Sequence, residues 1–114
     1  MDEVRATLRF SPSSAQKVRR VIDVIRGRKA PQALALLQSM PQTAAREVAK
    51  LLRSAIANAE ENAGWRPEDL VVSGVFANEG PTRRWRRFGA RGRFKPILRR
   101  TSHVTITLRE VTAE

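Results

Sequence analysis

Three β-strands are predicted in this chain, two from alternating hydrophobic and polar residues and one from a valine-rich stretch. The first runs from Val4 to Phe10, the second from Leu70 to Ala77 and the third from Thr101 to Leu108. The second is rich in valine, a residue that favours strands, and Gly74 within it predicts a β-bulge.

Hydrophobic residues at helical spacing predict three helices between the first two strands. Ser13 as the N-cap and Gln16 at the third helical position fit a capping box, and Gly27 ends this first helix. Pro31 suits the first turn of a second, short helix. Gly64 ends a third, longer helix, whose small apolar side chains we interpret as core. Its apolar stripe consists of Ala45, Val48, Ala49, Leu52, Ala55, Ile56, Ala59 and Ala63.

The second and third predicted strands flank residues 79–100, and the simplest connection makes this segment one extended antiparallel hairpin. With about ten residues per strand at roughly 3.3 Å each, this arm reaches roughly 30 Å. A compact domain of this length has a radius of gyration of only about 13 Å, so the arm must protrude. A two-stranded hairpin in water is marginally stable, so we expect a partner along its length. We therefore predict one domain of residues 1–114, with a globular part of residues 1–78 and 101–114.

Positive charge is concentrated in this arm. The 114 residues carry a formal net charge of +11, and nine basic residues without any acid lie between Arg83 and Arg100. A polyanion would relieve the repulsion among them and release counterions on binding. A second basic stretch, from Arg5 to Lys29, contains the single acid Asp23. The basic residues of the arm are Arg83, Arg84, Arg86, Arg87, Arg91, Arg93, Lys95, Arg99 and Arg100.

Aromatic residues are interleaved with the arginines of the arm. Trp85, Phe88 and Phe94 lie among them, and Gly89 and Gly92 allow a tight or irregular turn at the tip. This mixture suits RNA, because unpaired bases stack on aromatic rings and on guanidinium planes. The sequence therefore predicts that the partner is RNA and that the arm is its main binding surface.

The sequence offers no constellation for catalysis, a metal ion or a cofactor. It has no cysteine, which excludes thiolate chemistry, and His103 is its only histidine. The adjacent acids Glu60 and Glu61 do not face each other on a helix. No apolar stretch approaches the ~20 residues of a membrane span, and the N-terminus lacks a signal-peptide pattern. We expect a cytoplasmic protein that is not an enzyme, with no cofactor and no membrane partner.

Six ordered motifs resemble the family of bacterial large-subunit ribosomal protein twenty-two, the universal L-twenty-two family. The resemblance covers nearly all residues from Ala6 to Val111, and the last three motifs are highly specific at this spacing. Before the tip alanine the family commonly has Pro-Arg, where this chain has Phe88 and Gly89. In chain order the motifs are Ser14–Arg19, Ile25–Arg28, Ser54–Asn62, Glu79–Thr82, Ala90–Arg93 and Arg99–Thr105.

The resemblance implies an α+β domain, in which three helices pack on a three-stranded antiparallel sheet, with a long protruding β-hairpin. It implies a structural constituent of the large ribosomal subunit that binds large-subunit (23S) RNA and supports assembly. The hairpin would line the nascent-peptide exit tunnel and form a constriction there with ribosomal protein number four, so the nascent peptide would be a passing partner. The tip would consist of Phe88, Gly89, Ala90, Arg91, Gly92 and Arg93.

Candidate RNA-binding residues lie in the arm and in both flanking regions. Lys17, Arg19 and Arg20 are near a helix N-terminus, whose free N–H groups attract phosphate, although they could instead only cover an exposed helix face. His103 is either close to RNA, as the family motif implies, or a structural histidine. The candidates are Arg5, Arg9, Lys17, Arg19, Arg20, Arg83, Arg84, Trp85, Arg86, Arg87, Arg91, Arg93, Lys95, Arg99, Arg100, Thr101, Ser102 and His103.

Two other classes of function are compatible with the charge pattern. A sequence-nonspecific nucleic-acid chaperone would share the basic arm and keep it mobile in its working state. A basic membrane-surface protein would need an amphipathic basic helix, and the arm lacks helical periodicity.

Overall fold

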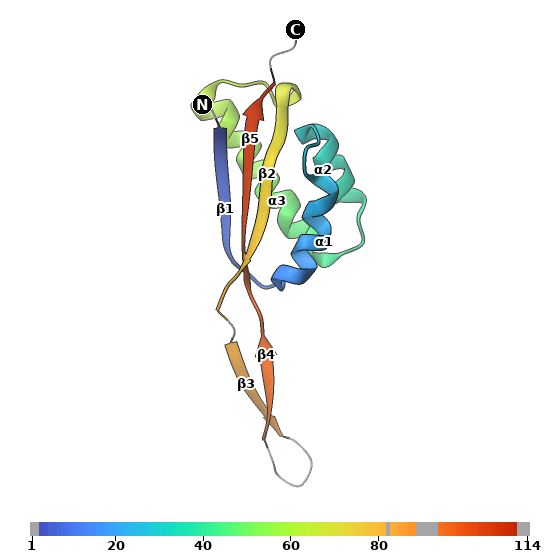
Figure 1. Cartoon of the computed structure of the whole chain (residues 1–114), viewed down its shortest axis with the longest axis vertical. Coiled ribbons are helices and arrows are strands. Elements are labelled where there is room, and N and C mark those ends of the chain that lie inside the picture. Colours follow the sequence, from blue (N-terminus) through green and yellow to red (C-terminus); the bar gives the residue numbers. More distant parts are fainter. Residues whose placement is uncertain (1–2, 82, 89–93, 112–114) are drawn as a thin grey trace.

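The computed structural model of the chain describes residues 3–81, 83–88 and 94–111, and for Phe10 and residues 83–88 and 94–99 it describes the backbone only. Figure 1 shows helices grouped beside a sheet from which a narrow hairpin extends. Within the described residues, three helices and a three-stranded antiparallel sheet confirm the predicted α+β class. The elements are β1 (Glu3–Ser11), α1 (Ala15–Ile25), α2 (Ala30–Ser39), α3 (Thr43–Ala63), the 3-10 turn η1 (Pro67–Asp69), β2 (Leu70–Glu79), β3 (Arg83–Phe88), β4 (Phe94–Arg99) and β5 (Ser102–Glu110).

The C-terminal strand β5 lies at the centre of the sheet and pairs antiparallel with β1 on one side and β2 on the other. A register shift between Val72 and Gly74 confirms the predicted bulge in β2. A Cβ at Gly74 would lie 2.8 Å from Oγ1 of Thr107 on β5. The two strands therefore approach too closely at the bulge for a side chain on this residue.

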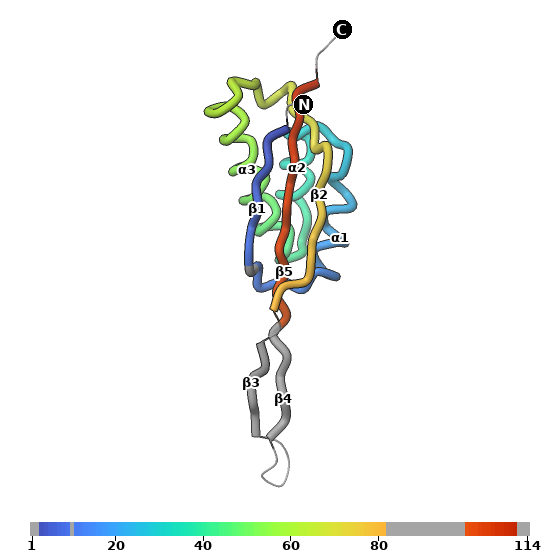
Figure 2. Tube along the Cα trace, turned by 60° about the vertical axis from the view of Figure 1, so that its left-hand side comes forward, coloured from blue at the N-terminus to red at the C-terminus, as the bar shows by residue number. Residues whose placement is uncertain are grey.

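The helices cover one face of this sheet (Figure 2). The long helix α3 packs against β1 and β5, and α1 packs against β2. Val104, Ile106 and Leu108 alternate along β5 toward the helices and are fully buried. Burial of each large aliphatic side chain contributes about 1.5–3 kcal/mol relative to exposure, so this layer holds the domain together. The opposite face of the sheet carries no helix in the described part of the chain.

Two details of the predicted helices were wrong. The N-cap of α1 is Ser14, whose hydroxyl accepts a hydrogen bond from the N–H of Lys17, and not Ser13. The carbonyl of Ser13 instead accepts a hydrogen bond from the buried Ser102, so a contact with β5 fixes where the helix begins. Ala63 is exposed, because α3 ends there and the chain turns at Gly64 in the left-handed conformation.

The arm strands β3 and β4 form a separate two-stranded antiparallel sheet that extends away from the globular part (Figure 1). The molecule is 69 Å long and only 25 and 17 Å across in the other two directions. Its radius of gyration of 17.2 Å exceeds the roughly 13 Å of a compact domain of this length. The protruding hairpin predicted from the sequence is therefore confirmed.

Candidate nucleic-acid interface

The register of the arm opposes like charges. Arg83 pairs with Arg99 and Arg87 pairs with Lys95 across the antiparallel ladder. Like charges directly opposite each other in a sheet are destabilising. A bound polyanion removes this repulsion, so the register favours an arm that is most stable with its partner in place.

Two arginines of the globular part, Arg5 and Arg9, lie at alternate positions on β1 and are exposed. Arg5 is paired in register with Thr107, and Thr7 with Thr105, on the sheet face away from the helices. Among the described residues, no hydrogen bond or ion pair engages either guanidinium group. Both groups are therefore available to a ligand.

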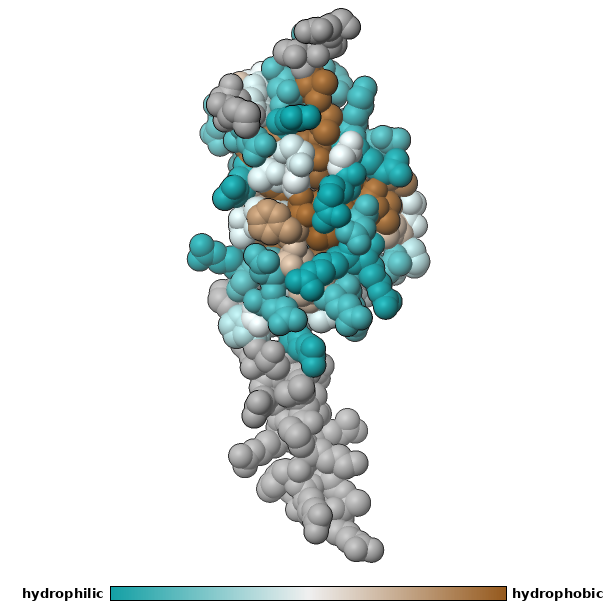
Figure 3. All heavy atoms as spheres, viewed as in Figure 1, coloured by the Kyte–Doolittle hydropathy of each residue, from teal (hydrophilic) through white to brown (hydrophobic). Residues whose placement is uncertain are grey.

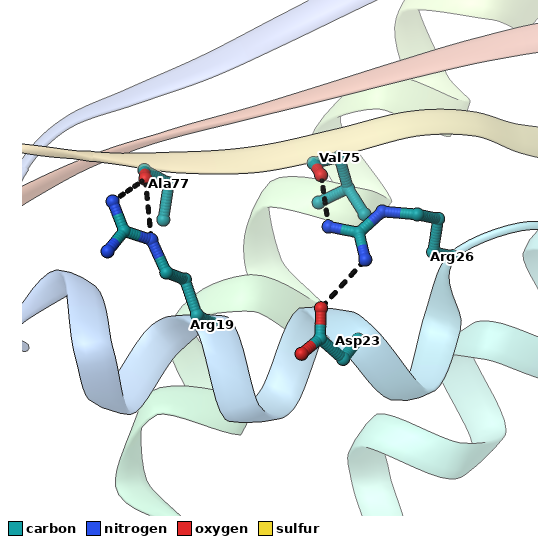
Figure 4. A network of polar contacts seen from close by, with 5 residues as sticks. All are labelled: Arg19, Asp23, Arg26, Val75 and Ala77. Atoms are coloured by element: carbon teal, nitrogen blue, oxygen red, sulfur yellow. Dashed lines mark hydrogen bonds and ion pairs between the residues drawn. The ribbon is translucent and has the colours of Figure 1, made fainter.

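Helix α1 places its basic residues in two different environments. Lys17 and Arg20 are exposed. Arg19 is also exposed, but its guanidinium group lies against β2, where Nε and Nη2 donate to the carbonyl oxygen of Ala77 at 3.2 and 2.9 Å (Figure 4). Its predicted RNA contact stays a prediction, although part of its hydrogen-bonding capacity already serves the sheet.

Seven residues further along the chain, Arg26 at the C-cap of α1 repeats this arrangement. Its Nη2 donates to the carbonyl oxygen of Val75 at 2.8 Å, and its Nη1 donates to Asp23 at 2.7 Å (Figure 4). The backbone that follows α1 also bonds to the outer edge of β2. The N–H of Gly27 donates to the carbonyl oxygen of Val72, and the N–H of Val72 donates to the carbonyl oxygen of Arg28. Helix α1 and the residues that follow it thus satisfy the outer edge of β2, which would otherwise attract another strand.

This structural role of Arg19 and Arg26 was not predicted from the sequence. The available signal was their spacing of seven residues, which places both on one face of a helix. That signal does not identify the partner, because the carbonyl groups of an edge strand become neighbours only in the folded chain.

The residues at the base of the arm hold one another. Thr101 donates its hydroxyl to the carbonyl oxygen of Pro81 at 2.7 Å, and its own carbonyl accepts from the N–H of Gly80 at 2.9 Å. Ser102 is fully buried and donates to the carbonyl oxygen of Ser13 at 2.8 Å. In the free chain these two hydroxyls fix the point from which the arm departs, and a further contact of either with RNA stays a prediction.

The arm leaves from the end of the globular part where α1 begins (Figure 1). Ser11 at the end of β1 is paired with Ser102 at the start of β5, next to the exposed Arg100. His103, one residue further along β5, is partly buried. The fold therefore brings the base of the arm, the N-terminus of α1 and the end of β1 together.

Some predicted residues lie outside this description. The tip residues Gly89, Ala90, Arg91, Gly92 and Arg93 are not among the described residues. The remaining arm candidates are described by backbone position only, and their contacts stay predictions: Arg83, Arg84, Trp85, Arg86, Arg87, Phe88, Lys95 and Arg99.

Two features are absent from the described residues. No group of His, Asp or Glu side chains there could hold a metal ion. No helix in that part of the chain has the length and apolarity to cross a membrane.

Comparison with known proteins adds independent evidence. Residues 6–109 match the family model described as ribosomal protein L22p/L17e. The chain is 48% identical over 112 residues to large ribosomal subunit protein uL22 of Synechococcus sp. (strain JA-3-3Ab). This alignment covers 98% of the chain and 91% of the relative. The chain is also 45% identical over 108 residues to the protein of the same name from Desulfatibacillum aliphaticivorans, which covers 95% of this chain and 99% of the relative.

Proposed function

The chain belongs to the ribosomal protein L22p/L17e family, and from this premise we propose that it binds 23S ribosomal RNA and lines the peptide exit tunnel with its arm. As a member of this family it is a structural protein of the large ribosomal subunit and not an enzyme. Its location is the cytoplasmic ribosome.

The observation that carries RNA binding is the arm, whose described strands β3 and β4 extend away from the globular part within a segment that has nine basic residues and no acid. The opposed like charges Arg83–Arg99 and Arg87–Lys95 are costly in the free protein. Contact with phosphates along both strands would remove this repulsion, and the release of counterions would add to the binding free energy. RNA on several sides of the arm is the partner that fits this distribution of charge.

The globular part would provide a second, smaller set of contacts. Arg9, Lys17 and Arg100 are exposed at or near the end from which the arm departs. They would bind the RNA that surrounds the base of the arm and so hold the domain on the surface of the subunit. Assembly of the subunit would then depend on both sets of contacts.

We assign the tunnel role to the far end of the arm. The proposal is that residues 88–93 reach the tunnel wall, meet ribosomal protein number four at a constriction and touch the nascent peptide in passing. The length of the molecule, 69 Å, supports a site far from the globular part. The tunnel itself is an inference from the family resemblance of the motifs that flank the tip.

The RNA proposal is tested by removing four charges from two places in the chain. One variant replaces Arg83, Arg84, Arg86 and Arg87 with Gln. The matched control replaces four exposed basic residues of the slightly acidic middle of the chain with Gln: Arg46, Lys50, Arg53 and Arg66. We expect the arm variant to bind 23S RNA at least roughly tenfold more weakly at about 0.1 M salt, with little change in the control. Equal losses in both would mean that total charge and not the arm governs binding, as for a nonspecific chaperone.

The tunnel proposal is tested by a photo-crosslinking amino acid at position 90 in ribosomes that carry a stalled nascent peptide. We expect crosslinks to that peptide or to RNA of the tunnel wall. Crosslinks only to exterior RNA or to cytosolic proteins would overturn the tunnel role and leave RNA binding intact.

A further inference from the structure

Phe76 is a large aromatic residue in an exposed position, with 44% of its surface accessible. It lies on β2, where its neighbours Val75 and Ala77 point into the core and are 2% and 3% exposed. Its side chain therefore stands on the sheet face away from the helices. Single exposed hydrophobic residues are common on protein surfaces, so the surroundings decide whether this one has a function.

The surroundings leave the ring open. Thr105 on β5 is paired with Phe76 in register, and Thr7 on β1 is paired in turn with Thr105, so a row of two small side chains extends across the sheet beside the ring. Gly74 precedes Phe76 by two residues on the same face and has no side chain. Because β2 is an edge strand, no neighbouring strand flanks the ring on its other side in the described residues. In Figure 3, hydrophobic surface lies between hydrophilic patches on the side where the strands are in front of α3.

Positive charge borders this open face. On β1, Arg5 and Arg9 lie two residues before and two residues after Thr7, which shares a cross-strand row with Thr105 and Phe76. The two arginines therefore lie on opposite sides of the row that contains Phe76. Two strand spacings separate β1 from β2, about 10 Å, which long arginine side chains can span. Within the described part of the chain, neither guanidinium has a hydrogen bond or an ion pair, in contrast to Arg19 and Arg26.

Asn78 adds a polar group to the same face. It is exposed, and its register partner is His103. An asparagine amide offers both donors and an acceptor, which suits the edge of a nucleobase. An aromatic ring, an amide beside it and arginines across the sheet together provide stacking, edge recognition and phosphate binding.

From this arrangement we propose that the open sheet face binds one unpaired nucleotide of large-subunit RNA, whose base stacks on Phe76 and whose backbone phosphates contact Arg5 and Arg9. This proposal rests on the proposed function, because it adds Phe76, a residue outside the basic arm, as a contact with the same RNA. A protein partner is less compatible with the face, because its centre is threonine and glycine and its charged border is basic.

The test measures binding of 23S RNA by variants of the full chain. Phe76→Leu keeps an apolar side chain and removes the ring, whereas Phe76→Tyr keeps the ring. Val24→Ala is the matched control, because Val24 is another exposed hydrophobic residue, 36% accessible, on α1. We expect roughly tenfold weaker binding for Phe76→Leu, since stacking of one base contributes a factor of roughly 5 to 150, and unchanged binding for the other two.

Failure of this inference and failure of the proposed function give different results. If the variant with four Gln residues in the arm loses affinity while Phe76→Leu does not, the stacking site is wrong and RNA binding by the arm stands. If the arm variant also retains full affinity, the proposed function itself fails. A photo-crosslinking amino acid at position 76 gives a second readout in assembled subunits. Crosslinks to RNA support the site, and crosslinks to another ribosomal protein instead of RNA overturn it.

Discussion

A methyl group added at Gly80 would lie 2.6 Å from the hydroxyl oxygen of Thr101, closer than such atoms can approach. The N–H of Gly80 also donates to the Thr101 carbonyl at 2.9 Å, and Thr101 donates in turn to Pro81. These contacts link the two chain segments where the globular sheet gives way to the arm. The base of the arm is thus a tightly packed junction whose geometry depends on having a glycine, with no Cβ, at position 80.

Replacing Gly80 with Ala is therefore expected to lower the free energy of unfolding by about 1–3 kcal/mol, as insertions into packed sites do. Thermal or denaturant unfolding measures this cost. Thr101→Ala removes the hydroxyl that the new methyl group meets, so the double variant should lose less than the sum of the two single variants. Additive losses would mean that the clash is absorbed elsewhere, for example by movement of His103, whose Nε2 would lie 3.3 Å from the new Cβ.

Ser102→Ala should destabilise the fold by about 1–2 kcal/mol, because it leaves the Ser13 carbonyl without its buried donor. Ser39→Ala is the matched control. Ser39 is exposed and donates to the Leu36 carbonyl within its own helix, so its loss should cost less than about 0.5 kcal/mol. If Ser102 also contacts RNA, the folded variant will lose RNA affinity in addition to stability, and the two measurements separate the roles.

Arg19 and Arg20 are adjacent on α1 and should behave differently. Arg19→Ala removes the donor to the Ala77 carbonyl at the outer edge of β2 and should lower stability by about 1 kcal/mol. Arg20→Ala should leave the melting temperature unchanged and weaken RNA binding at low salt. A stable Arg19→Ala protein would show that water replaces the guanidinium at this edge without cost.

Deletion of residues 83–99 should leave a folded globular domain that unfolds cooperatively. The core of the globular part is built from side chains of β1, α1, α2, α3, β2 and β5, which are elements outside this segment, and the Gly80–Thr101 hydrogen bond keeps the two new ends close together. Circular dichroism with thermal melting of the deletion variant tests this expectation. Loss of the cooperative transition would show that the arm contributes to the core.

Binding of 23S RNA should weaken steeply as salt is added. Each phosphate contact contributes roughly 0.7–0.9 to the slope of log affinity against log salt concentration. The nine basic residues of the arm and several of residues 5–29 could contact phosphate, and if about half of these engage at once the slope is on the order of −5. Filter binding across a salt series measures it, and a slope near −1 would mean that most of these charges are idle.

The sequence by itself determined the elements of this protein and the distribution of its charge. Helical spacing, Gly27 and Gly64 located the helices to within a residue or two. Alternation and valine content located the strands of the globular sheet, because all these signals are local. The nine basic residues of the arm and the absence of acids among them predicted a polyanion partner without any knowledge of the fold.

Only the tertiary structure decided which arginines are available for binding. Arg19 and Arg5 look alike in the sequence, yet one donates to the Ala77 carbonyl while the other has no partner among the described residues. The same holds for the N-cap at Ser14, since Ser13 is held by Ser102, which is 89 residues away in the chain. Each outcome depends on a contact between distant segments, and such contacts exist only once the sheet and α1 have packed together.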